Sequence, residues 1–532
     1  MANSEWRFPL LGGGQYQGYT NNDIEAFKGQ EMIDNLAREI CQNSLDEHLD
    51  GSNEPVKVVF ELKKVKTDQY DVFSQYSDCL TGCRKYWGDD MDSRLARFVA
   101  NAEKTLEEPY VSILVASDYN TKGLDGSRTE DKKSGWVALT CSEGVSAKNN
   151  ENSGGSYGIG KNAPFACSAL SMVFYNTIDE KSEGAFVGVA KLATILNRDN
   201  EPTQRVGKYQ RPDGTPIYES DANAFRDLFS RTERGTDVIV VGFTESHEWV
   251  YNITKAVLKN FFVAVIENKL IVELKDGTKV TVIDSETISQ LFSDHSSEKE
   301  LICAHQLYNA FINPDCKETM QVFEPNDVEV YIKSDSTYKR TIANFRETGM
   351  LVGSYSKRIY QHYAAVVIVR GKELGKLLLE TEPPRHNRWD YKQIESSEKE
   401  KRRKAKASID KINDFVLQLL KSQFETITED VIDAEGVGEY LPDEAVGESA
   451  ESKGDDILKA KVKIGKSQIN RIKQGITINP AAKSEGEENN GEADNKTRPK
   501  KPIPPKPPKP VPPIPNVPPV PVKPVTPKPD TP

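Results

Sequence analysis

The segment LAREICQNSLD, residues 36–46, constrains the fold of this chain more than any other stretch. Glu39, Asn43 and Asp46 stand at positions i, i+4 and i+7, so a helix places their side chains on one face. A neighbouring stripe is apolar and can pack on a sheet; it comprises Ile33, Leu36, Ala37 and Ile40. Such a half-buried helix offers a neutral oxygen to a hard cation at Asn43 and a base for water at Glu39. By itself, the pattern also fits an ordinary solvated helix face.

Two β-branched runs follow, at residues 55–62 (PVKVVFEL) and 110–118 (YVSILVASD), and both are predicted strands. The second run ends in Asp118, with Asn120 and Gly123 close behind. A buried carboxylate at a strand end can accept a hydrogen bond from an exocyclic amino group, which would distinguish adenine from guanine. A turn-initiating aspartate is the alternative.

Residues 152–170 read NSGGSYGIGKNAPFACSAL, a glycine-rich loop that runs directly into an apolar helix. Glycines allow positive φ angles and bring backbone N–H groups against phosphate oxygens, and a helix N-terminus adds its positive dipole. Further strands are predicted at 171–177, 185–194 and 235–243, and the last of these opens with a Gly-Thr pair.

The stretch from Gly155 to Lys161 also fits the first seven positions of a P-loop. Position 162 is Asn instead of the Ser or Thr that would bind Mg²⁺, and the preceding segment is too polar for the buried strand that a P-loop follows. The P-loop is therefore rejected.

The order of these motifs resembles the GHKL ATPase superfamily, whose members include gyrase, MutL, MORC proteins and histidine kinases. The match covers about residues 20–245, and the family's N-box, E-x-x-x-N-[ST]-x-D, corresponds to residues 39–46. The resemblance implies a Bergerat-type α/β sandwich in an α+β chain, with ATP and Mg²⁺ as its cofactors. A second, transducer-like α/β domain would follow.

The resemblance also assigns roles to residues. Glu39 would be the general base and Asn43 the Mg²⁺ ligand, with Lys161 as a second catalytic group. The resemblance would place a lid over the triphosphate at 155–161 and the adenine end of the site at 118–123 and 236. The remaining nucleotide-binding positions would be Asp46, Asp118, Asn120, Gly123, Gly155, Gly158, Gly160 and Thr236. In place of the family's D-x-G-x-G, this chain has one extra residue in the turn, which Asn120 can accommodate because asparagine tolerates a left-handed conformation.

Composition limits the alternatives. The chain has 532 residues, enough for three or four domain-sized units, and its low hydrophobic content of 37% reflects a polar C-terminal tail. No apolar run is long enough to span a bilayer and no signal peptide is evident, so we expect a cytoplasmic protein without a membrane partner. The seven cysteines lack the spacing of a structural zinc site. A net charge of −11 argues against coating nucleic acid over the whole surface but leaves a local basic groove open.

The predicted organisation has six parts. These are an N-terminal arm (1–30), which in GHKL dimers can cross to the partner; the ATPase domain (31–245) with an insertion at about 64–109; the transducer-like domain (246–394); a charged amphipathic helix (395–424); an acidic linker with a short interaction segment (425–480); and a disordered Pro-rich tail (481–532). The tail repeats P-x-x-P and is either a spacer or a ligand for Pro-reading domains.

A transducer lysine reaches the γ-phosphate in the family, and the candidates here are Lys357, Arg358, Arg385 and Arg388. The function expected is ATP hydrolysis with nucleotide-dependent homodimer closure on a macromolecule. The chain resembles the bacterial MORC-related branch most, which implies DNA-linked restriction or anti-phage defence by analogy. A histidine kinase is disfavoured because no His precedes the N-box. A nucleotide-sensing scaffold, which binds ATP without turnover and recruits partners through its tail, stays open.

Overall fold

The computed structural model describes residues 4–19, 24, 31–129, 131–141, 160–244, 247–383 and 385–425. All of them belong to one compact unit, Met1–Asp433. The expectations for Gly155, Gly158 and residues 426–532 fall outside the described part of the chain. Within the described residues, no helix has the length and apolar character needed to cross a membrane.

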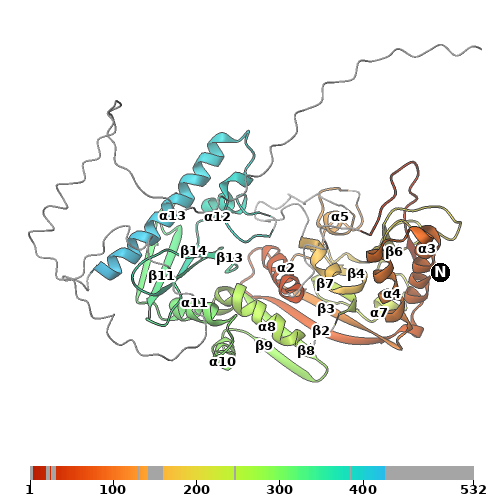
Figure 1. The fold of residues 1–532 in the computed structure, drawn as a ribbon, viewed down its shortest axis with the longest axis horizontal. Helices are drawn as coiled ribbons and strands as arrows, with labels where there is room; N and C mark the ends of the chain where they lie inside the picture. Colours follow the sequence, from red (N-terminus) through yellow and green to blue (C-terminus); the bar gives the residue numbers. More distant parts are fainter. Residues whose placement is uncertain are drawn as a thin grey trace, which may run out of the picture. The chain divides into compact units, whose positions relative to one another are not determined.

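The first sheet has nine strands in the described chain, in the order β1-β6-β5-β4-β7-β3-β2-β8-β9 (Figure 1). Neighbouring strands are antiparallel except β2 and β8, which are parallel. The strands are β1 (Glu5–Arg7), β2 (Val56–Lys66), β3 (Tyr110–Tyr119), β4 (Ser168–Ile178), β5 (Gly184–Lys191), β6 (Val206–Gln210), β7 (Gly235–Phe243), β8 (Leu270–Asp276) and β9 (Lys279–Ile283).

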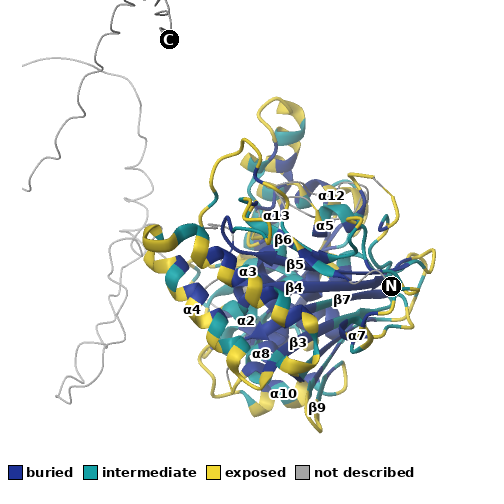
Figure 2. Cartoon of the chain, turned by 90° about the vertical axis from the view of Figure 1, so that its right-hand side faces the viewer, coloured by how far each residue is buried: buried dark blue, intermediate teal, exposed yellow. Residues whose placement is uncertain are grey.

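Helices cover both faces of this sheet, because its central strands are apolar on both sides (Figure 2). On β3, Leu114 and Ala116 pack in one core cluster with α2 (Met32–Asp46) and α8 (Trp249–Asn260). Ile113 and Val115 alternate with them and pack in the opposite cluster, with α3 (Asp71–Trp87) and α4 (Ser93–Glu107). The expected insertion at 64–109 is thus the helical layer of the second face. Short helices complete this part: α5 (Gly135–Thr140), α6 (Ala163–Ala166) and α7 (Ala224–Asp227).

A second sheet has the order β10-β11-β14-β12-β13, with β12 and β14 parallel. Its strand β14 is buried throughout: alternate residues pack in the cluster that holds α11, and the others pack in the cluster that holds α13. The elements are α9 (Phe262–Ile266), α10 (Ile288–Asp294), α11 (Ile302–Ile312), β10 (Cys316–Met320), β11 (Val328–Ser334), β12 (Thr341–Phe345), β13 (Leu351–Tyr355), β14 (Tyr363–Val369), α12 (Lys372–Leu379) and α13 (Lys399–Glu425).

The boundary expected at residue 245 differs from the observed arrangement. The amphipathic pattern of residues 247–268 predicts one long helix, but the structure divides this segment into α8 and α9 at Phe261. The hairpin of β8 and β9, which turns at Gly277, extends the first sheet instead of opening the second. The reason is the apolar face of β8, which pairs in parallel with β2 and needs the helical crossover before it. The predicted α+β class is confirmed: a sheet with helices on both faces is followed by a second sheet with its own helices.

The described part of the N-terminal arm, residues 4–19, lies on the sheet of its own chain. Strand β1 pairs with β6, and the Leu11 N–H donates to the Pro202 carbonyl at 2.9 Å. Further along, the Gln17 N–H donates to Thr194 Oγ1 at 3.0 Å. This stretch therefore completes one edge of the sheet.

Candidate active site

A cavity of about 90 Å³ lies beside α2 and the C-terminal end of β3. It brings together residues far apart in the sequence, and the predicted site residues among its lining are Glu39, Asn43, Asp118, Gly123, Gly160, Lys161 and Thr236. Asp46 and Asn120 are absent from the described lining. A single cavity thus brings together the predicted base, the predicted metal ligand and the predicted adenine contact.

The carboxylate of Asp118 is the most highly organised group in this cavity. Its Oδ1 accepts hydrogen bonds from Thr121 Oγ1 at 2.6 Å and from the Thr236 N–H at 2.8 Å. Its Oδ2 accepts from Ser44 Oγ at 3.1 Å. Burial raises the pKa of Asp118, and the Arg231 guanidinium together with these donors opposes the rise.

The strand pair β3–β7 explains why Asp118 and Thr236 meet. The antiparallel register pairs Ser117 with Asp237. Arg231 fixes the backbone here: it donates to the Asp118 carbonyl and forms an ion pair with Asp237 at 2.5 Å, with both side chains buried. Gly235 has φ +131°, and a Cβ at this position would overlap the Asp118 carbonyl, so the Gly-Thr pair depends on glycine.

Helix α2 presents Glu39 and Asn43 to the cavity because its apolar residues are buried on the sheet side. Asn43 is exposed, whereas Glu39 is partly buried. Burial raises the pKa of Glu39, and His386, Arg38 and Arg346 act in the opposite direction. A carboxylate with a raised pKa is a stronger base, which suits proton abstraction from water.

Gly160 and Lys161 form the wall next to Glu39. A Cβ on Gly160 would overlap the Glu39 carboxylate, so only glycine allows this close approach. Lys161 Nζ donates to the Ala138 carbonyl at 3.1 Å. The residue that follows, Asn162, accepts a hydrogen bond from the buried Lys191 at 2.6 Å, which holds this wall on the sheet.

Two predicted nucleotide contacts point elsewhere. Asp46 shares the helical face of Glu39, but seven residues of helix place it about 10 Å further along the axis, where it pairs with Arg346 at 3.3 Å. Asn120 has the expected left-handed conformation, φ 62°. Its carboxamide accepts from Ser52 Oγ at 3.1 Å and donates to the Pro55 carbonyl at 3.3 Å, so it closes the turn.

We call the second sheet and its helices, from α11 to α13, the second unit. It contacts α2 through residues that the sequence did not single out. Arg346 and Glu382 form a buried ion pair, and His386 joins them. None of the candidate cations for the γ-phosphate is among the described residues of the cavity lining; these candidates are Lys357, Arg358, Arg385 and Arg388. Arg385 and Arg388 belong to the sequence TEPPRHNRWD at 381–390. In that sequence, the His386 carbonyl accepts a hydrogen bond from Arg38 of α2, and Glu382 binds Arg346. Near Asp118, the residues that sequence reasoning missed are Thr121 and Arg231, while Ser44 occupies the [ST] position of the N-box.

The donor set suits Mg²⁺ bound together with a nucleotide. No group of three or more His, Cys, Asp or Glu residues in the described chain is arranged to hold a metal ion alone. Mg²⁺ usually keeps several waters and takes one or two protein oxygens plus substrate phosphates. The Asn43 carboxamide oxygen, in the same cavity as Glu39, fits that requirement.

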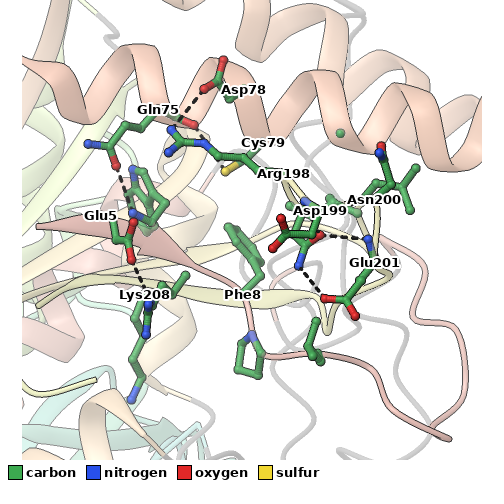
Figure 3. A pocket seen from close by; sticks show the side chains of 18 of the residues that line it. Glu5, Phe8, Gln75, Asp78, Cys79, Arg198, Asp199, Asn200, Glu201 and Lys208 are labelled. Atoms are coloured by element: carbon green, nitrogen blue, oxygen red, sulfur yellow. Dashed lines mark hydrogen bonds and ion pairs between the residues drawn. The ribbon is translucent and has the colours of Figure 1, made fainter. Parts of the chain in front are cut away.

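A larger cavity, of about 960 Å³, opens between residues 5–10, α3 and the 195–201 loop (Figure 3). Its charges are mixed and partly paired, as between Arg198 and Asp78 at 3.3 Å. None of the predicted site residues is among its described lining residues.

No protein-family model matches the chain, and no curated protein matches it. Among solved structures, the chain is similar to the B subunit of DNA gyrase from Myxococcus xanthus, with 11% identity over 69% of this chain and 85% of that chain at a TM-score of 0.31. It is similar to the ATPase region of Saccharomyces cerevisiae topoisomerase II, with 10% identity over 69% and 80% of the two chains at a TM-score of 0.32. It is also similar to the 43K ATPase domain of Thermus thermophilus gyrase B in complex with an aminocoumarin, with 11% identity over 74% and 92% at a TM-score of 0.27.

Proposed function

We propose that the chain binds ATP with Mg²⁺ and hydrolyses it. The observation that carries this proposal is the state of the Asp118 carboxylate. An ionised carboxylate has about four acceptor sites, and three are occupied here, by Thr121, Thr236 and Ser44. The remaining acceptor site belongs to a partly buried carboxylate that lines the cavity, where it can accept a hydrogen bond from the exocyclic amino group of adenine.

The reaction proposed for the other cavity residues is attack of water on the γ-phosphorus. Glu39, whose pKa is raised by burial, takes the proton from water. Asn43 contributes a ligand to Mg²⁺, which neutralises negative charge that develops on the phosphate oxygens. Lys161 and the backbone at Gly160 provide cationic and N–H groups on the wall beside Glu39.

Nucleotide binding requires this wall to move. The cavity of about 90 Å³ is well below the roughly 300–1,000 Å³ of small-molecule pockets. In the structure, the Gly160 backbone packs directly against the Glu39 carboxylate. We therefore expect residues 160–161 to withdraw from Glu39 when the triphosphate enters, and to close over it afterwards.

The broader biological proposal follows the family resemblance. ATP binding would drive homodimer closure in the cytoplasm, and the dimer would act on a macromolecule, with DNA in a bacterial defence system as the proposed context. The Pro-rich tail would add reach or capture a Pro-reading partner. The basic start of α13 is a weaker candidate for DNA contact, because Lys401 and Lys404 form ion pairs with Glu380 and Glu373 at 2.5 and 2.6 Å.

The decisive experiment measures phosphate release and ATP binding on the same purified protein. Wild-type turnover, lost in Glu39→Gln while ATP binding persists, supports an ATPase with Glu39 as its base. ATP binding without turnover in the wild type supports the nucleotide-sensing scaffold. Absence of any ATP binding, with or without Mg²⁺, contradicts the proposal.

A further inference from the structure

Helix α2 is joined to the second unit by a buried group of charges, which we call the Arg346 cluster: Arg346, Asp46, Glu382 and His386. Arg346 Nη1 lies 3.3 Å from Asp46 Oδ2, and Arg346 Nε donates to Glu382 Oε1 at 3.0 Å. His386 Nδ1 lies 2.9 Å from Arg346 Nη2 and 2.8 Å from Glu382 Oε2. Asp46 belongs to α2, whereas Arg346 directly follows strand β12, and Glu382 and His386 follow helix α12.

The second unit makes a second attachment to α2 at Arg38, on the other side of Glu39 from Asp46. Arg38 Nη2 donates to the Leu351 carbonyl at 3.0 Å and to the His386 carbonyl at 2.7 Å. Arg38 immediately precedes Glu39, and Asp46 stands two turns after it. The second unit therefore contacts α2 on both sides of Glu39 and Asn43, and His386 takes part in both attachments.

The electrostatics of the cluster favour a fixed geometry. Burial acts to lower the pKa of Arg346, but the negative charges of Glu382 and Asp46 outweigh it and raise that pKa. Burial acts to raise the pKa of Glu382, and Arg346 holds that pKa below its usual range. Glu382 is 4% exposed and Arg346 is 9% exposed. Buried ion pairs contribute less to stability than their number suggests, and they bring geometric specificity when each partner is satisfied.

We propose that Arg346, Glu382 and His386 are positioning residues, which hold α2 so that Glu39 faces the γ-phosphate. This inference rests on the proposed ATPase function and adds to it that turnover depends on the contact between the second unit and α2. ATP binding depends on this contact much less, because Asp118, Thr236 and Ser44 are held by hydrogen bonds within the first sheet and α2.

The chain offers a matched control. Arg370 is also a partly buried arginine of the second unit with two carboxylate partners, Glu267 at 2.5 Å and Glu329 at 2.9 Å. Among the described residues, the hydrogen bonds of its guanidinium go to Glu329 and Glu267, which lie outside α2. Arg370→Lys therefore perturbs the same chemistry without touching the N-box helix.

The experiment uses the full chain and compares Arg346→Lys, Asp46→Asn and His386→Asn with Arg370→Lys. The three cluster variants are expected to lower kcat at least tenfold while the Kd for a non-hydrolysable ATP analogue with Mg²⁺ changes less than about threefold. Combining Arg346→Lys with Asp46→Asn should lower kcat little more than either change alone, because both changes remove the same interaction between Arg346 and Asp46. Arg370→Lys should leave kcat and Kd near their wild-type values.

Amide hydrogen exchange across α2, measured without nucleotide, provides a readout that does not need activity. Faster exchange in the cluster variants, with unchanged exchange in Arg370→Lys, supports the attachment even if the wild type does not turn ATP over, in which case the proposed function alone fails. Unchanged exchange and kcat in the cluster variants would overturn the inference. Equal losses in the Arg370→Lys control would also overturn it, because they would indicate general destabilisation.

Discussion

Replacing Asp118 with asparagine tests how the cavity selects its base. Asparagine has nearly the same shape, and its carbonyl oxygen can keep the Oδ1 position, where Thr121 and Thr236 donate. Its NH₂ group then takes the Oδ2 position next to Ser44. The Ser44 hydroxyl already lies 2.9 Å from the Ile40 carbonyl, to which it can donate while it accepts from the new NH₂ group. The local network therefore survives the substitution.

The adenine contact does not survive. The amino group of adenine is a donor, and in Asp118→Asn the open position on the cavity side also becomes a donor. A buried donor left without an acceptor costs about 1–3 kcal/mol, which corresponds to a roughly tenfold to hundredfold loss of affinity. GTP, with a carbonyl oxygen at that position of its base, should lose much less and can gain.

Isothermal titration calorimetry with non-hydrolysable ATP and GTP analogues measures both affinities, and urea unfolding reports stability. We expect a weaker ATP affinity, a narrowed preference for ATP over GTP and a small change in the free energy of unfolding. Asp118→Ala is the contrasting variant, since it removes the acceptor of the Thr121 hydroxyl and the Thr236 N–H and should also destabilise the fold. An unchanged ATP affinity in Asp118→Asn would refute the assignment of Asp118 to the adenine amino group.

Four further predictions concern the same part of the molecule. Glu39→Gln should retain ATP binding and lower phosphate release about a hundredfold or more; equal turnover in the two proteins would remove Glu39 as the base. Burial raises the pKa of Glu39, and the deprotonated form is the base. Wild-type turnover should therefore be complete above that raised pKa and disappear as the pH falls through it, at a higher pH than for an exposed glutamate. A pH–rate profile with its acid limb near pH 4 would contradict this. Gly235→Ala should lower the free energy of unfolding by more than about 1 kcal/mol, because residue 235 has a positive φ and its Cβ would overlap the Asp118 carbonyl. Gly277 also has a positive φ, but a Cβ there meets open space, so urea titration of Gly277→Ala measures the φ strain without the overlap. A chain that ends near Asp456 should still shift from monomer to dimer with a non-hydrolysable ATP analogue and Mg²⁺, and light scattering that shows the same mass with and without nucleotide would exclude ATP-driven closure.

Sequence patterns identified the parts of the site that depend on local structure. The i, i+4 spacing places Glu39 and Asn43 one turn apart on the helix whatever that helix packs against. Asp118 lies near the end of a strand whose residues alternate between two buried faces. Gly235 can be identified because it comes directly before a β-branched run. The predicted chemistry thus needed only the periodicity of single elements and the order of motifs.

The remaining features depend on contacts between segments far apart in the sequence. Asp46 obeys the same helical periodicity as Glu39, and its partner Arg346 is 300 residues away. The β8–β9 hairpin looked like the start of a new domain because its alternating pattern suits either sheet. Only the parallel pairing of β8 with β2 decides between them. Register and long-range charge pairing leave no local pattern, so sequence reasoning could not assign these residues.

This division has a consequence for how the proposed function would work. At the proposed adenine end of the cavity, Asp118 accepts hydrogen bonds from Ser44 and Thr236, and these bonds lie within the first sheet and α2. Glu39, the proposed base, instead lies between the Gly160 wall and the attachments of α2 to the second unit. Nucleotide binding should therefore tolerate changes in the second unit that abolish turnover. Such a chain would bind ATP first and hydrolyse it only when the second unit is correctly positioned against α2. The nucleotide-sensing and hydrolytic alternatives would then be two stages of one cycle.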